Sequence, residues 1–190
     1  MLLMNIMKQY EPFVINEHIF SLSHLDPFYT EYVQPAKQDK GEKRYRCLIE
    51  FSSHCFTRSP NKHKGETLES YDSTLHYTTQ KETRIFCFER YQLSLQLPDI
   101  LREMDKQKCF FTSANDKFLT ISIQNQAGEN VDYEIYFSLK KSKKCDVHIF
   151  INSAYVRSAD YQAAPLRRKP ISFFVLLNNT LINKRIKKPI

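Results

Sequence analysis

The sequence predicts an α+β protein in which an antiparallel sheet of five or six strands, arranged as a meander, packs against one main amphipathic helix. Three observations predict this class. Short segments alternate between apolar and polar residues, short polar connections separate the later segments, and a single stretch repeats apolar residues at helical spacing. The chain has 190 residues, of which 42% are hydrophobic and 26% charged, so it can bury a core and is too apolar to be wholly disordered.

Residues 1–44 are predicted to be an N-terminal arm and linker. Pro12, Pro27 and Pro35 interrupt this stretch, and a polar segment around Gly41 ends it. We expect irregular structure here, with the apolar residues 13–15 and 19–20 docking onto the domain that follows.

No segment favours a membrane. The longest apolar run is far shorter than the roughly 20 residues that span a bilayer. The apolar first seven residues make a poor signal peptide. We therefore expect a soluble, cytoplasmic protein.

A single domain is predicted over residues 45–177, and it opens with a strand at 45–51, where apolar side chains alternate. A long polar loop with a short strand near residues 75–78 should lead to a second strand at 83–88. Residues 97–108 predict the main helix, because apolar residues recur there at the first, fourth, fifth and eighth positions and Pro98 suits a first helical turn.

The second half of the domain predicts a meander. Residues 117–124, 131–139 and 147–156 alternate and are joined by short polar turns. After a loop at 157–170, the apolar run 171–177 fits either a buried strand or the start of a helix, and its length leaves both open. Residues 178–190 are predicted to be a basic tail.

The charge distribution points to a polyanionic partner. The formal net charge is +7, but residues 140–190 carry twelve basic and two acidic side chains, while the rest of the chain has a net charge of −3. Such polarity predicts binding to nucleic acid or to an acidic protein complex, although a merely solvated basic tail gives the same pattern. The predicted nucleic-acid-binding residues are Lys140, Lys141, Lys143, Lys144, Arg157, Arg167, Arg168, Lys169, Lys184, Arg185, Lys187 and Lys188.

No cofactor and no metal are predicted. The chain lacks the glycine-rich phosphate loops and the zinc-binding motifs, and His54, Cys55, His63 and His76 do not follow the paired spacing of zinc ligands. The five cysteines are odd in number and include no CxxC pair, which favours reduced thiols.

One stretch suggests catalysis. His54 could act as a general acid or base and Arg58 could bind phosphate, with Cys55 as a possible nucleophile. The alternative is that Cys55 is packed and His54 is hydrogen-bonded.

Two further residues, Tyr91 and Arg157, are candidates to stabilise the phosphate. The alternative for the segment around Tyr91 is that Arg90 pairs with a carboxylate while Tyr91 packs. Residues 152–157 loosely resemble the last strand of small ribonuclease toxins of the RelE/ParE type, in which an arginine at the place of Arg157 would face the phosphate.

Five segments together carry a second resemblance: 86–100 (FCFERYQLSLQLPDI), 109–112 (CFFT), 134–139 (EIYFSL), 152–157 (NSAYVR) and 169–180 (KPISFFVLLNNT). Over residues 45–189 the chain is similar to poorly characterised bacterial proteins of prophages and integrative elements labelled heat shock protein C or stationary-phase growth adaptation protein. The resemblance implies a mobile-element setting and transfers no catalytic residues.

Three hypotheses for function follow. The first is a mobile-element accessory protein that binds nucleic acid, or a nucleoprotein or acidic partner, through a basic C-terminal surface. The second is a protein-directed inhibitor or regulator of host defence or transcription. The third is a small metal-independent ribonuclease. The sequence leaves open the choice of DNA or RNA and the formation of homo-oligomers.

Overall fold

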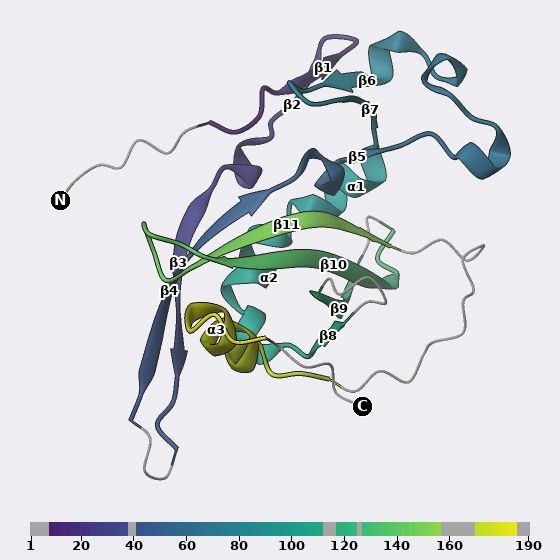
Figure 1. Cartoon of the computed structure of the whole chain (residues 1–190). Helices are drawn as coiled ribbons and strands as arrows, with labels where there is room; N and C mark the ends of the chain where they lie inside the picture. The colour runs from purple at the N-terminus through teal and green to yellow at the C-terminus, as the bar shows by residue number, and fades with distance from the viewer. Residues whose placement is uncertain (1–7, 38–40, 112–116, 125–126, 157–169, 186–190) are drawn as a thin grey trace.

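The computed structural model describes residues 8–37, 41–111, 127–156 and 170–185, together with the backbone of 117–124. The described chain is an α+β protein, which confirms the predicted class (Figure 1). Its strands are β1 (Phe13–Ile15), β2 (His18–Phe20), β3 (Phe28–Gln34), β4 (Lys43–Phe51), β5 (Thr57–Arg58), β6 (His76–Thr78), β7 (Thr83–Phe86), β8 (Cys109–Phe111), β9 (Lys117–Gln124), β10 (Asn130–Lys141) and β11 (Val147–Val156).

Three α-helices lie within these ranges: α1 (Phe88–Ser94), α2 (Leu97–Arg102) and α3 (Phe173–Leu181). Short 3₁₀ turns include η2 (Ser53–Cys55) and η6 (Met104–Lys106). Among the described residues, no helix is both long enough and apolar enough to cross a bilayer.

The main sheet has the strand order β3-β4-β11-β10-β9-β8. Strands β8 to β11 are antiparallel neighbours, but β11 then pairs in parallel with β4, so that Val147 lies opposite Cys47 and Ile151 opposite Phe51. The predicted single antiparallel meander is therefore wrong. Alternation identifies which residues form strands, but it carries no information about a partner far away in the chain.

The first 44 residues contribute regular structure, so the expectation of irregular structure is wrong for β1, β2 and β3. Strand β3 forms an edge of the main sheet against β4. The hairpin β1–β2 turns at Asn16 and Glu17, both with positive φ, as a tight two-residue hairpin turn requires. Its Phe13 stacks on Phe86 of β7 with ring centroids 3.9 Å apart, which attaches the hairpin to the small sheet β5-β7-β6.

The helices differ from the prediction in two places. The helix predicted at 97–108 is divided into α2 and η6, because Glu103 leaves helical geometry with φ −109° and ψ 20°. The segment 171–177, for which strand and helix were both left open, is mostly helical. Helix α3 begins at Phe173 and ends at Leu181, within the predicted tail. Before it, Ile171 forms a single β-bridge to Cys109. Helix α1 was not predicted.

One face of the main sheet carries the core. Alternate residues of β4, β10 and β11 are buried there against the helices, for example Ile49, Ile135 and Ile149. Phe173 of α3 packs edge-on against Tyr32 of β3 with ring centroids 4.9 Å apart. The three helices and the sheet thus share one apolar cluster.

A β-bulge at Asn152 changes which side chains of β11 face this core. Tyr136 pairs with Ser153 and Phe137 with Ile151, so Asn152 is an extra residue without a direct partner. Ile151 and Ala154 are both fully buried as a result. Tyr155 then stacks on Tyr136 with ring centroids 5.5 Å apart.

The helical assignment of α3 predicts unequal effects at two of its positions. Phe173 is 1% exposed and Val175 is 45% exposed. We expect Phe173→Ala to lower the free energy of unfolding by about 3–5 kcal/mol, because it leaves a cavity. Val175→Ala should change it by less than about 1 kcal/mol. Urea unfolding of both variants measures this, and equal losses would contradict the assignment.

Candidate functional site

The turn between β10 and β11 forms one side of a basic groove. This groove has a volume of about 480 Å³ and is lined by Arg46, Lys141, Ser142, Lys143, Lys144, Cys145, Asp146 and Leu181. Leu181 is the last residue of α3, so the lysine turn lies beside the point from which the C-terminal residues continue. We call these eight residues the basic groove.

Arg46 joins the groove because β4 pairs with β11. The Arg46 guanidinium donates to the carbonyl of Lys144 at 2.9 Å, and its backbone N–H donates to the Asp146 carboxylate at 2.8 Å. Asp146 returns a backbone hydrogen bond to the Arg46 carbonyl at 2.8 Å. Arg46 was not predicted, since it lies in the acidic part of the chain and only the non-local pairing with β11 brings it to the turn.

The lysines of the turn are exposed, and the described part of the chain provides them with no ionic partner. Within the described ranges, no carboxylate lies within 4.0 Å of the ammonium group of Lys140, Lys141, Lys143 or Lys144. Arg44 on β4, by contrast, pairs with Glu31 and Glu42 at 2.8 Å each. Asp146 is the one carboxylate in the groove lining, and four lysines in or beside the turn outnumber it.

The other predicted nucleic-acid-binding residues divide into two groups. Lys184 and Arg185 are exposed, and they lie three and four residues after Leu181 in the sequence. Arg157, Arg167, Arg168, Lys169, Lys187 and Lys188 lie outside the described residues.

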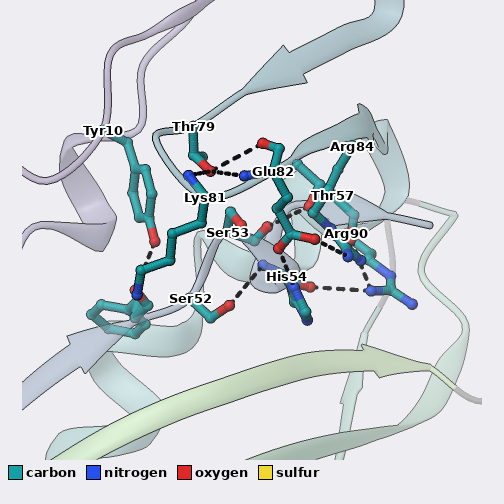
Figure 2. Close-up of polar contacts among 11 residues, drawn as sticks. Tyr10, Ser52, Ser53, His54, Thr57, Thr79, Lys81, Glu82, Arg84 and Arg90 are labelled. Atoms are coloured by element: carbon teal, nitrogen blue, oxygen red, sulfur yellow. Dashed lines mark hydrogen bonds and ion pairs between the residues drawn. The ribbon is translucent and has the colours of Figure 1, made fainter. Parts of the chain in front are cut away.

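His54, the first predicted catalytic residue, belongs to an ion-pair network after β4 (Figure 2). Its ring nitrogen Nε2 lies 2.7 Å from one oxygen of Glu82, whose other oxygen accepts from Arg84 at 3.2 Å. Burial raises the pKa of Glu82, but the hydrogen bonds from His54 and Arg84 outweigh burial and lower it overall. The carboxylate is thus held ionised between two cationic or donor groups.

Three arginines meet beside this network in a pocket of about 650 Å³. The pocket is lined by Arg58, Ser59, Asn61, Arg84, Cys87, Glu89, Arg90, Leu93, Tyr155 and Val156. Arg84 and Arg90 come from β7 and α1, which are consecutive in the chain, and the tertiary fold brings Arg58 of β5 to them. We call this site the arginine pocket.

The two inner arginines of the pocket are fixed by the same short strand. Arg84 donates from Nε to the Thr57 hydroxyl at 2.8 Å, and Arg90 donates from Nη1 to the carbonyls of His54 at 3.1 Å and Thr57 at 2.8 Å. The Arg90 guanidinium also lies over the Tyr155 ring, 4.8 Å from its centroid.

Arg58 sits at the outer side of the pocket. Its guanidinium lies over Tyr71 at 4.7 Å and 3.7 Å from the Glu66 carboxylate. It is less buried than Arg84 and less tightly held than either inner arginine.

The three predicted catalytic residues do not converge. Arg58 lines the arginine pocket, whereas His54 does not line it and contacts it only through its backbone carbonyl. Tyr91 is 9% exposed and packs against Phe20 and Phe86, so the packing alternative holds for Tyr91. The predicted carboxylate partner of Arg90 is not found among the described residues, where the backbone carbonyls of His54 and Thr57 bind the guanidinium.

Cys55 is not placed to act as a nucleophile. It is fully buried, and burial raises its pKa to about 12 despite the nearby charge of Arg90. The thiolate required for attack is therefore disfavoured. In the part of the chain that the structure describes, no three His, Cys, Asp or Glu side chains are grouped to hold a metal ion.

Comparisons with known proteins cover both sites. The model of the YjaZ family matches residues 12–181. Protein YjaZ of Escherichia coli (strain K12) is 27% identical over 172 residues, which are 90% of this chain and 89% of that protein. No solved structure matches the chain. The family match extends from before β1 to the end of α3, so the basic groove and the arginine pocket lie within it.

Cysteine accessibility gives one prediction. Cys47, Cys55 and Cys109 are buried, and burial raises the pKa of each thiol, whereas Cys87 and Cys145 are partly exposed. We expect iodoacetamide to alkylate only Cys87 and Cys145 in the folded protein. Peptide mass mapping, with urea-unfolded protein as control, measures this. Rapid labelling of Cys55 in the folded state would contradict its position.

The Glu82 network gives a second prediction. The pKa of Glu82 is lower in the folded state than the ordinary value of 4.5, so the ionised Glu82 carboxylate stabilises the fold above that pH. The contribution is lost as pH falls through the lowered folded value. We expect Glu82→Gln to unfold at less urea than wild type near about pH 7, and the difference to shrink near about pH 3.

The control for that prediction is Glu103→Gln. Glu103 forms an exposed ion pair with Lys106 at 2.8 Å, a type of pair that contributes little to stability. The urea midpoint of the Glu103→Gln variant should stay near the wild-type value at both pH values. A Glu82→Gln difference that does not change with pH would refute the role of the ionised carboxylate.

Proposed function

This chain belongs to the YjaZ family, and we propose that it is an accessory protein that binds nucleic acid through the basic groove and the residues that follow α3. The observation that carries the proposal is the meeting of the unpaired lysine turn with the end of α3 in one groove. The exposed residues Lys184 and Arg185 follow within four residues of Leu181, which lines this groove.

The chemistry of the groove suits a phosphate backbone. Lysine ammonium groups neutralise phosphates and release bound counterions, and this provides affinity that falls steeply with salt. Arg46 adds a guanidinium whose position is fixed by its bond to the Lys144 carbonyl. Such contacts position a nucleic acid without reading its bases. We therefore expect little sequence preference.

The resemblance to proteins of prophages and integrative elements supports a mobile-element setting for this binding. An acidic protein surface would be attracted to the groove for the same electrostatic reason as a nucleic acid. This holds for an acidic partner complex and for an acidic target in host defence or transcription. The experiment below separates these hypotheses from nucleic-acid binding.

The test replaces three lysines of the groove. The combined variant Lys141→Gln, Lys143→Gln and Lys144→Gln should weaken binding to a generic duplex and a generic single strand at low salt. Each lost phosphate contact should reduce the slope of log affinity against log salt by about 1, hence by about 3 in all. Fluorescence anisotropy over a range of salt concentrations measures both quantities.

A matched control removes the same charge elsewhere. Lys62, Lys81 and Lys108 are exposed and lie outside the groove, and their combined replacement by Gln should leave the salt slope nearly unchanged. Equal losses in both variants would mean that net charge alone acts, and would reject the groove. Absence of binding to either nucleic acid by the wild type would reject the proposal in favour of an acidic protein partner.

A further inference from the structure

Arginines outnumber carboxylates in the lining of the arginine pocket. Three arginines and one glutamate, Glu89, line it. Arg58 and Arg84 have carboxylate neighbours at its margin, Glu66 and Glu82. Arg90 has none: over the described residues, no carboxylate lies within 4.0 Å of its guanidinium, and it contacts backbone carbonyls and the Tyr155 ring.

Backbone carbonyls hold the Arg90 guanidinium in one orientation. Both of its hydrogen bonds use Nη1, so the carbonyls fix the orientation of the guanidinium plane. Burial lowers the pKa of Arg90, and the charge of Arg84 adds to this effect. A partly buried cation without a counterion is costly, and an anion in the pocket would offset that cost.

The Tyr133 hydroxyl is a second unsatisfied group near Arg90. It is fully buried and has no hydrogen-bond partner among the described residues. Burial raises its pKa well above the ordinary value, and Arg90 is close enough to oppose that rise. Tyr133 lies opposite Val156, which lines the pocket. A buried donor without a partner next to a cationic pocket is typical of a site that an anion or a water completes.

We propose that the arginine pocket binds the phosphate group of a small phosphorylated molecule. Its volume of about 650 Å³ lies within the range of about 300–1,000 Å³ common for small-molecule sites. Among the described residues Arg90 has no carboxylate partner, and a phosphate monoester, with a charge of about −1.5 to −2, would supply a counterion. Guanidinium groups bind phosphate oxygens in pairs, and Leu93 and Val156 offer apolar contact to the rest of the molecule.

This site is independent of the basic groove. The lysine turn of the groove leads into Val147, the first residue of β11. The pocket includes Val156, the last residue of the same strand. Loss of either binding activity therefore leaves the other open to measurement.

The test uses Cys87, the thiol that lines the pocket, as a reporter. Inorganic phosphate and adenosine monophosphate are added to the folded protein, and the rate of alkylation of Cys87 is followed by mass spectrometry. The alkylation rate of glutathione in the same solution serves as the reference, because Cys145 lies in the basic groove. We expect at least one of the two phosphates to slow alkylation of Cys87 more than that of glutathione. Adenosine, and sodium chloride at equal ionic strength, should have no such effect.

Two matched variants locate the binding. Arg58→Gln removes a guanidinium that lies over the Tyr71 ring at 4.7 Å and pairs with Glu66. Arg102→Gln removes a guanidinium outside the pocket with the same kinds of contact, to the Phe28 ring and to Asp99. Loss of one charge-assisted hydrogen bond should weaken protection of Cys87 by about tenfold in Arg58→Gln. Arg102→Gln should behave as wild type.

Three results would overturn the proposal. The first is that neither phosphate protects Cys87 of the wild type at millimolar concentration. The second is that adenosine protects it as well as the monophosphate does. The third is that Arg58→Gln, shown to be folded by circular dichroism, is protected as strongly as Arg102→Gln.

Discussion

The parallel pairing of β4 with β11 is the interaction on which the rest of the structure depends. It joins residues one hundred positions apart, such as Cys47 and Val147, and unites the β3–β4 hairpin with strands β8 to β11 in one sheet. At one end it brings Arg46 to the lysine turn. At the other end the Ser52 N–H donates to the Ile151 carbonyl at 2.9 Å, which fixes the start of the turn that holds His54. Both candidate sites therefore depend on this one pair of strands.

The two sites use cations in different ways. The groove presents lysines, whose exposed and strongly hydrated ammonium groups act as mobile point charges. The pocket uses arginines whose planar guanidinium groups are held by Thr57, by backbone carbonyls and by the rings of Tyr71 and Tyr155. Mobile charges suit a long and variable polyanion, whereas oriented donors suit a single compact group.

Local patterns predicted most elements of the fold and few of their partners. Strands β9 and β11 match the predicted bounds, because alternation is a property of the strand itself. The parallel partner of β11, the bulge at Asn152 and helix α1 were not predictable in this way. The bulge and the pairing come from tertiary contacts, and the short α1 has too few turns for a clear apolar period.

In the two candidate sites, too, local features were predictable from the sequence and distant partners were not. Arg58 and the lysine turn were found because residue type and charge density are visible in the sequence. Arg84 and Arg46 were missed, since each acquires its role from elements distant in the chain. Tyr91 was selected on chemistry alone, and its burial between Phe20 and Phe86 shows that an aromatic residue beside an arginine more readily joins a core.

The length of β11 has an electrostatic consequence. Ten residues of strand separate the lysine turn from the arginine pocket by about 30 Å, at about 3.3 Å per residue. The Debye length at physiological ionic strength is about 8 Å. Charge brought to one end of the strand is therefore screened by the solvent before it reaches the other end.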